Sequence, residues 1–274
     1  MPEVIVSGSF DDIRSRHVRF LEEASRSGPV TVLLWCDETA AALQGSLPKF
    51  PLQERRYLID ALRFVNRVEI TGATSQQKLF AHMLQLQPGL VVEAEGSRGG
   101  GLADGCRSHH IPYRVIPESQ LAGFPMPEGH GIPSRPDRKK VVVTGCYDWL
   151  HSGHVRFFEE ASALGDLYVV VGHDANVRQL KGESHPHFSQ GERLYMVQAI
   201  RYVTQAHLTS GWGWMDAEPE ITQVIRPQLY AVNEDGDVPE KRAFCQQHGI
   251  EYVVLKRKPK QGLPRRESTR LRGF

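Results

Sequence analysis

Two histidines, His151 and His154, are the residues of this sequence that are best suited to phosphate chemistry. They follow an apolar run over 141–144, at the start of a helical pattern over 154–164. A helix N-terminus offers unpaired backbone N–H groups and the positive end of the helix dipole, so it attracts phosphate oxygens. Two imidazoles there add donors for the same anion, and Gly153 lets the backbone or a ligand approach closely. The H-x-G-H spacing therefore predicts a phosphate site.

The strand and helix patterns around these histidines predict how they are held. Apolar, β-branched runs over 141–145 and 167–172 are typical of strands buried on both faces of a parallel sheet. Helical patterns alternate with such runs, at 154–164, 190–202, 217–225 and 238–248. The expected fold class is α/β, with two tandem Rossmann-like units that each contain a parallel sheet flanked by helices. Ligands are expected beyond the carboxyl ends of the strands.

The sequence repeats itself at an offset of 137 residues, which is half of its length of 274. The stretch VIVSGSFDDIRSRHVRFLEEAS (4–25) aligns with VVVTGCYDWLHSGHVRFFEEAS (141–162), and later stretches match in the same order. Such ordered matches indicate a tandem duplication of one unit. We expect a first unit over 1–116, a Pro/Gly-rich linker over 117–138 and a second unit over 139–274.

Composition and charge exclude several classes of protein. Lys and Arg number 33 and Asp and Glu number 32, so the formal net charge is +1. This balance argues against a nucleic-acid-binding protein, which carries a clear excess of basic residues. No stretch approaches the roughly 18 apolar residues of a membrane span, and we expect a cytoplasmic protein. The four cysteines form no CxxC pair, and we interpret His185 and His187 as loop residues rather than a metal pair.

The turn G-C-Y-D-W-L-H-S-G-H over 145–154 resembles that of the cytidylyltransferase family within the HxGH nucleotidyltransferase superfamily. The resemblance extends over 139–274, with 1–116 as a weaker second copy. In that family a substrate phosphate attacks the α-phosphate of a nucleoside triphosphate and releases pyrophosphate with the help of Mg²⁺. The resemblance implies that His151 and His154 stabilise the transition state and that Asp148 lies near the metal.

Three further stretches resemble motifs of this family. NVRQLKG places a lysine that reaches the triphosphate at Lys181, and FSQGER places an arginine near the phosphates at Arg193. RRESTRLRG (265–273) resembles the signature S-T-x-[I/L]-R, which opens a helix beside the phosphates. The resemblance thus implies catalytic roles for His151, His154 and Lys181. It implies nucleotide contacts for Gly145, Cys146, Tyr147, Asp148, Gly153, Arg193, Ser268, Thr269 and Arg272.

Four residues are candidates for binding the acceptor. Trp212 and Trp214 follow the strand-like run AHLTS, and their indole faces suit a substrate or a cationic headgroup. Hydrophobic packing between domains is the equal alternative for both. Asn233 and Asp235 come just after the run QLYAV, at the carboxyl edge of the expected sheet. For these two, ordinary turn chemistry is the alternative.

The sequence leaves the nucleotide base open. Cytidylyltransferases usually carry R-T-x-G-I-S-T before the last helix, and Leu263 stands here in place of that arginine. The form S-T-x-L-R is equally at home among adenylyltransferases of the superfamily. The R-Y-V stretch over 201–203 and the tandem architecture favour CTP, with ATP as the alternative. The expected function is transfer of CMP to a small phosphorylated acceptor, and a non-catalytic nucleotide-binding or regulatory protein is the other alternative.

The tandem arrangement resembles that of the phosphoethanolamine cytidylyltransferases, which hold two such domains, one of them degenerate. Here the first unit is the degenerate copy, because Arg14 replaces the first histidine and Arg16 replaces the glycine, while His17 remains. We expect this unit to be catalytically silent, and an anion site for an effector at the same three residues is the alternative. The two units would pair as an intramolecular pseudo-dimer, in a chain that is a monomer or a homodimer.

Overall fold

The structure is a computed structural model, and it describes residues 1–97, 102–126, 133–267 and 271. The chain divides into two compact units, Met1–Gly123 and Phe124–Phe274, which are called the first and the second unit below. Each unit contains one five-stranded sheet. Within the described residues, no helix is both long enough and apolar enough to cross a membrane.

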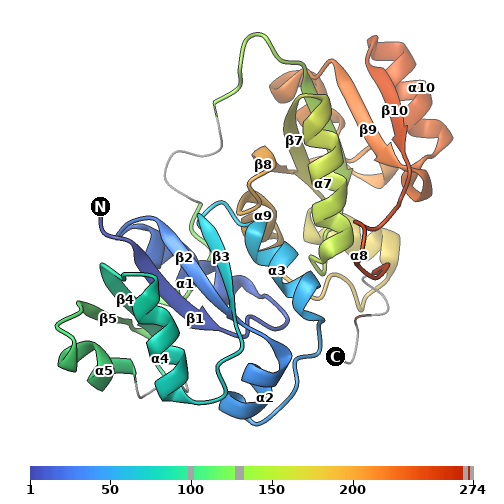
Figure 1. The fold of residues 1–274 in the computed structure, drawn as a ribbon. Coiled ribbons are helices and arrows are strands. Elements are labelled where there is room, and N and C mark those ends of the chain that lie inside the picture. Colours follow the sequence, from blue (N-terminus) through green and yellow to red (C-terminus); the bar gives the residue numbers. More distant parts are fainter. Residues whose placement is uncertain (98–101, 127–132, 268–270, 272–274) are drawn as a thin grey trace. The chain divides into compact units, whose positions relative to one another are not determined.

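The first unit alternates strands and helices along the chain (Figure 1). Its strands are β1 (Val4–Gly8), β2 (Val30–Trp35), β3 (Arg67–Thr71), β4 (Leu90–Ala94) and β5 (Tyr113–Ile116). Its helices are α1 (Ser15–Ser25), α2 (Asp37–Gln44), α3 (Leu52–Asp60), α4 (Gln76–Gln85), α5 (Leu102–Ser108) and α6 (Glu118–Leu121).

The second unit follows the same plan. Its strands are β6 (Lys140–Gly145), β7 (Asp166–Val171), β8 (Val203–Leu208), β9 (Leu229–Asn233) and β10 (Glu251–Leu255). Its α-helices are α7 (Ser152–Leu164), α8 (Asp174–Lys181), α9 (Gln190–Gln198) and α10 (Pro239–His248). Three shorter turns of helix are η1 (Gly213–Met215), η2 (Glu220–Ile225) and η3 (Glu234–Gly236).

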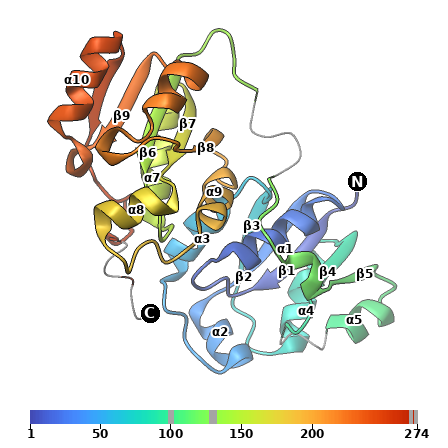
Figure 2. The same ribbon diagram turned by 180° about the vertical axis from the view of Figure 1, so that it is seen from behind.

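The two sheets have the same topology. Their strand orders are β3-β2-β1-β4-β5 and β10-β9-β6-β7-β8, which become identical when each unit is numbered from its own first strand. All strand pairs are parallel, and helices cover both faces of each sheet (Figures 1 and 2). The expected α/β fold of two Rossmann-like units is therefore confirmed. In such sheets ligands bind where the strand order reverses, which is between β1 and β4 and between β6 and β9.

The cores explain why the strand sequences are apolar throughout. Every residue of β7 is buried, and the central strand β6 buries Val141, Val142 and Val143 completely. On one face of this sheet, residues of β6, β7 and β9 pack against η2 and α10 in a cluster that includes Val142 and Phe244. On the other face α7 packs against β6 and β7. Burial on both faces removes the polar alternation that a half-exposed strand shows.

The first unit continues beyond 116, into the stretch that the composition marks as a linker. Helix α6 packs against α1, where the Arg19 guanidinium donates a hydrogen bond of 2.9 Å to the carbonyl of Gln120. Glu118, the first residue of α6, forms an ion pair with Arg16 at the start of α1. The boundary between the units lies after Gly123.

Candidate active site

The turn between β6 and α7 is built around an aromatic ring. Tyr147 adopts the left-handed backbone conformation, with φ of 51°, which folds its ring back over Gly145. A Cβ at position 145 would lie 2.8 Å from that ring, so glycine is required there. The Tyr147 ring packs against His154, with 5.3 Å between centroids, and against Phe158. Gly145 and Tyr147 are expected beside the nucleotide, and in the structure Gly145 makes room for the Tyr147 ring that packs against His154.

His151 caps the N-terminus of α7 with its side chain. Its Nδ1 accepts a hydrogen bond of 3.1 Å from the backbone N–H of Gly153, which places the proton of a neutral ring on Nε2. His151 is 2% exposed, and among the described residues its Nε2 has no hydrogen-bond partner. A buried donor without a partner is costly and rare in folded proteins, so this atom indicates a missing ligand.

Gly153 makes this cap possible. A Cβ at position 153 would lie 2.9 Å from Cε1 of His151 and 3.0 Å from its Nδ1. Any other residue would therefore push the imidazole away from the start of α7. The close approach that the sequence predicts at this glycine is made by the ring of His151.

His154 stacks on His151, with 4.0 Å between ring centroids and 21° between ring planes. Its Nδ1 is also buried without a partner among the described residues, as is the hydroxyl of Tyr147. Three unpartnered polar atoms thus lie together at the start of α7. They are beside the carboxyl end of β6, the position where the sheet topology predicts a ligand.

Both imidazoles are neutral in the free protein. Burial, followed by the positive charges of Arg257 and Arg266, lowers the pKa of His151 to about 3. Burial, His151 and Arg257 lower the pKa of His154 well below its ordinary value, while a backbone hydrogen bond to Trp149 acts in the opposite direction. A bound anion would offset the repulsion from the arginines and favour protonation.

Acid should therefore destabilise the second unit through His151. The unfolded chain takes up a proton near pH 6.5 and the folded chain only near 3, so stability is lost as the pH falls below 6.5. Between pH 7 and pH 5 this lowers the free energy of unfolding by about 2 kcal/mol. The variant His151→Asn keeps a capping side chain and should lack this loss. Urea unfolding of both proteins at the two pH values measures the difference, and equal losses would contradict it.

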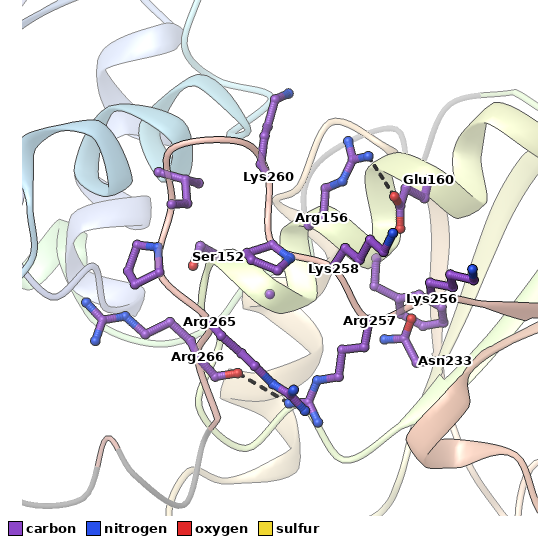
Figure 3. A pocket seen from close by; sticks show the side chains of 15 residues that line it. Ser152, Arg156, Glu160, Asn233, Lys256, Arg257, Lys258, Lys260, Arg265 and Arg266 are labelled. Carbon is purple, nitrogen blue, oxygen red and sulfur yellow. Dashed lines mark hydrogen bonds and ion pairs between the residues drawn. The ribbon is translucent and has the colours of Figure 1, made fainter.

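A basic pocket lies at the start of α7 (Figure 3). It is small, about 20 Å³, and it opens beside Ser152, Gly153 and Asn233. The 256–266 segment that follows β10 forms one of its walls. Its cationic lining residues are Arg156, Lys256, Arg257, Lys258, Lys260, Arg265 and Arg266. This concentration of positive charge favours an anion with several negative groups, such as a triphosphate.

Arg257 belongs to the basic run before the C-terminal signature, and no sequence motif assigns it an individual role. Its charge lowers the pKa of both histidines, so it acts on the same space as they do. It forms an ion pair with Asp235 and donates a hydrogen bond of 3.3 Å to the carbonyl of Arg266. Asp235, expected to bind the acceptor, instead holds this guanidinium. Only the basic run over 256–260 could have indicated Arg257 from the sequence.

Lys181 is the last residue of α8 and is exposed. Its charge contributes to the lowered pKa of His154, and it acts against the burial that raises the pKa of the Cys146 thiol. These effects place its ammonium group within electrostatic reach of the histidine pair. Lys181 therefore extends the cationic surroundings of the histidines from the C-terminal end of α8.

Arg193 has a different role from the one expected. It is 1% exposed, and its guanidinium donates to the carbonyls of Phe188, Cys146 and Gly172, at 3.0, 2.6 and 2.7 Å. It also forms an ion pair with Asp174 at 2.7 Å. These bonds occupy Nε and both terminal nitrogens, so Arg193 joins three segments of the unit and does not face a phosphate. The backbone carbonyl of Cys146 thus accepts its hydrogen bond from a protein group.

The first unit repeats this arrangement with Arg55. Its guanidinium donates to the carbonyls of Phe50, Ser9 and Trp35, at 3.0, 2.6 and 2.8 Å, and pairs with Asp37 at 2.6 Å. The first unit lacks the H-x-G-H sequence. The buried arginine is therefore required by the fold and not by phosphate chemistry.

The aspartate of this turn accepts backbone hydrogen bonds in both units, as Asp148 in the second and as Asp11 in the first. Oδ1 of Asp148 accepts hydrogen bonds from the N–H groups of His187 and Phe188, at 2.6 and 3.1 Å. In the first unit Asp11 accepts equivalent bonds from Lys49 and Phe50. The other oxygen of Asp148 pairs with Nδ1 of His185 at 3.0 Å. This carboxylate is therefore already committed to protein groups.

The expected magnesium contact at Asp148 does not fit these surroundings. Asp148, His185 and His187 bring their ligand atoms within 4.8 Å of one another, so the two histidines do have a third metal-capable group nearby. The interpretation of His185 and His187 as isolated loop residues is wrong in this respect. Two imidazoles and one carboxylate are a donor set typical of transition metals, whereas Mg²⁺ prefers oxygen ligands and water.

The remaining candidates lie outside the basic pocket or outside the described residues. Trp212 and Trp214 are each 60% exposed, and Trp212 meets His173 edge-on, with 4.9 Å between ring centroids. Neither indole lines the basic pocket, whereas Asn233 does, at the end of β9. Three predicted residues of the C-terminal signature lie outside the described residues: Ser268, Thr269 and Arg272.

Comparisons with known proteins show the family of the second unit. A family model described as cytidylyltransferase-like matches residues 142–271. An FAD synthase from Aciduliprofundum boonei is 34% identical over 122 residues, which are 43% of this chain and 78% of that protein. The chain belongs to the cytidylyltransferase-like family of nucleotidyltransferases. Its second unit is thus a nucleotidyltransferase-type enzyme domain, as the sequence predicts.

Further relatives of this cytidylyltransferase-like chain carry the name bifunctional protein HldE. The protein from Pelobacter propionicus is 34% identical over 99 residues, and the one from Aliarcobacter butzleri is 43% identical over 120 residues. The matches cover 35% and 43% of this chain but only 20% and 24% of the relatives. A solved lipopolysaccharide core biosynthesis protein from Thermoplasma volcanium is 24% identical, with a TM-score of 0.38, over 45% of this chain and 99% of its own.

Proposed function

We propose that the second unit transfers a nucleoside monophosphate from a nucleoside triphosphate to a small phosphorylated acceptor and releases pyrophosphate. The observation that carries this proposal is the pair of stacked, neutral imidazoles with unpartnered, buried nitrogen atoms at the start of α7. The basic pocket beside them supplies the charge that a triphosphate requires. The family assignment supports the same reaction class.

In this reaction an oxygen of the acceptor phosphate attacks the α-phosphorus of the triphosphate. The new P–O bond forms while the bond from the α-phosphorus to the bridging oxygen breaks, and that oxygen leaves with the pyrophosphate. Nε2–H of His151 donates to the oxygens around the α-phosphorus, where negative charge is held in the transition state. His154 and the N-terminus of α7 contribute to the same site, while Lys181 and Arg257 offset the charge of the leaving pyrophosphate.

Magnesium enters this proposal only as the companion of the triphosphate. The cation would supply further neutralisation of the phosphate oxygens when bound. No residue of the chain is assigned to it, because both oxygens of Asp148 already have protein partners. The residues described above act by positioning the phosphates and by donating hydrogen bonds.

Two bases are candidates for the transferred nucleotide. CMP is favoured by the R-Y-V stretch over 201–203 and by the tandem architecture that resembles phosphoethanolamine cytidylyltransferases. AMP is the second candidate, because one relative that the chain covers to 78% is named an FAD synthase and FAD contains an adenylate group. A protein that binds a nucleotide without turnover is the third candidate, because the unpartnered histidine nitrogens suit a bound phosphate in either case.

A matrix of pyrophosphate-release assays tests the proposal. CTP, ATP, UTP and GTP are each combined with phosphoethanolamine, glycerol phosphate, and sugar or alditol phosphates, in the presence of Mg²⁺. We expect turnover with one triphosphate and one acceptor class, and its loss when EDTA removes the cation. Release of pyrophosphate with no combination, by a protein shown to bind a triphosphate, would favour the non-catalytic alternative. Turnover with ATP alone would replace CMP by AMP.

A further inference from the structure

The first unit has an open cleft at the carboxyl end of its sheet, called the N-terminal cleft below. Its volume is about 400 Å³, within the range of roughly 300–1,000 Å³ that is typical of ligand pockets. It lies where β1 and β4 end, at Gly8 and Ala94, which is the reversal point of this sheet. Trp35, Phe20 and Leu79 form apolar walls. A unit that had merely lost its activity would not be expected to keep such a cleft open.

The start of α1 beside this cleft no longer suits a phosphate. Arg14, in place of the first histidine, pairs with Asp12 at 2.8 Å. Arg16, in place of the glycine, forms a two-pronged ion pair with Glu118, whose Oε2 lies 3.0 Å from its Nε. Each new cation is thus matched by a carboxylate of the same unit. Arg16 lines the cleft, but these carboxylates offset the attraction of both arginines for phosphate oxygens, which makes the anion site for an effector that the sequence left open less favourable.

The N-terminal cleft of the first unit contains a buried carboxylate at a position where the second unit has a valine. Leu90 pairs with Val4 as Leu229 pairs with Val141, and this register places Glu93 at the position of Val232 in the second unit. Glu93 is 8% exposed and lines the cleft. The exchange of a buried valine for a glutamate is costly for the fold unless the carboxylate has a partner.

Only one oxygen of this carboxylate has a partner in the fold. The hydroxyl of Tyr113 donates to Oε2 of Glu93, whereas no hydrogen bond to Oε1 is found among the described residues and this oxygen is accessible to solvent in the cleft. Burial raises the pKa of Glu93, which the Tyr113 hydrogen bond partly offsets. An acceptor therefore faces the cleft and lacks a donor.

Two further polar side chains of the cleft, His17 and Trp35, have hydrogen bonds that fix their orientation. Nδ1 of His17 accepts a bond of 3.1 Å from the backbone N–H of Arg14, so a neutral ring carries its proton on Nε2. Burial lowers the pKa of His17 and keeps the ring neutral. Nε1 of Trp35 donates to Oγ of Ser7 at 2.6 Å, which holds the indole against the cleft.

We infer that the N-terminal cleft binds an uncharged, phosphate-free nitrogen heterocycle of nucleoside size. An N–H group of the ligand donates to Oε1 of Glu93, since a carboxylate only accepts hydrogen bonds. The flat ring of the ligand packs against Trp35 and Phe20, as aromatic faces do. Glu118 and Asp12 exclude phosphorylated relatives of the same compound. This inference does not depend on the proposed function of the second unit.

Calorimetric titration of the full chain with cytidine, uridine, adenosine and guanosine, and with their 5′-monophosphates, tests this inference. At least one nucleoside should bind, and Glu93→Val, which restores the residue of the second unit, should weaken that binding about tenfold or more. Glu93→Leu, which also removes the acceptor, serves the same purpose if the valine variant fails to fold. The surface variant Glu69→Gln is the matched control and should bind as the unchanged protein does. Pyrophosphate release by the second unit should be equal in all of them.

Three results would overturn the inference. The first is the absence of binding by every nucleoside. The second is an affinity of both Glu93 variants that equals the affinity of the unchanged protein. The third is monophosphate binding that is as tight as nucleoside binding and equally sensitive to Glu93→Val. The variant Glu118→Gln gives a further check, because it frees the charge of Arg16. It should raise the affinity of the cleft for the monophosphate by about tenfold. An unchanged affinity would contradict exclusion by this carboxylate.

Discussion

Replacement of His154 by alanine is expected to lower kcat for pyrophosphate release several hundredfold, with a much smaller effect on KM. The imidazole stacks on His151, and its Nδ1 is buried without a partner among the described residues. A pre-positioned polar group of this kind stabilises a charged transition state by about 3–4 kcal/mol, because nothing has to reorganise when the charge develops. Steady-state kinetics on the pair of substrates found in the assay matrix measures the loss.

The first unit supplies a matched control for this experiment. His17 occupies the same position in the repeat and packs edge-on against Phe10, as His154 packs against Tyr147. His17→Ala should therefore leave kcat nearly unchanged. Circular dichroism and thermal melts of both variants separate a catalytic loss from a folding defect. Equal losses in the two variants would show that the active unit is wrongly assigned, and full activity of His154→Ala would refute the mechanism.

Arg193→Ala should lower the free energy of unfolding of the second unit by about 4 kcal/mol. The substitution leaves three backbone carbonyls without their donor and removes the ion-pair partner of Asp174. The equivalent substitution in the first unit, Arg55→Ala, should cost a similar amount there. Chemical unfolding that is monitored by hydrogen exchange assigns each loss of unfolding free energy to its unit.

This pair of variants also separates two roles for Arg193. If the guanidinium bound phosphate, the activity of Arg193→Ala would fall at low denaturant while stability stayed close to normal. We expect instead that the folded fraction and the activity of Arg193→Ala decline together as the denaturant concentration rises. A variant with normal stability and lost activity would restore the phosphate contact that the sequence motif suggested.

The features that could be predicted from the sequence are those encoded locally. Apolar runs identify buried parallel strands, and the 137-residue repeat predicts that both units share one topology. The histidine pair is also local, because its i, i+3 spacing and its place at a helix start determine its geometry. His151 and His154 lie together for that reason.

The errors arose where one side chain is held by distant parts of the chain. The motif FSQGER contains Phe188, which is one of the three carbonyl partners of Arg193, but the other two, Cys146 and Gly172, directly follow β6 and β7. The Asp148 contact with His185 spans 37 positions, and the Arg257 contact with Asp235 spans 22. Such pairings depend on tertiary packing, which neither periodicity nor motif spacing encodes.

The crowding of cations in the basic pocket has a consequence for the life of the protein in a cell. The first turn of α7 contains no acidic residue, and the carboxylates that pair with Arg156, Arg257, Lys260 and Arg265 lie elsewhere in the unit, so a bound anion would add further partners for the cations of this pocket. A ligand that binds only the folded unit, at a concentration one hundred times its Kd, adds about 2.7 kcal/mol to stability. Nucleotide supply would then govern how often this unit opens to proteases, and starvation would shorten the lifetime of the enzyme as well as slow its reaction.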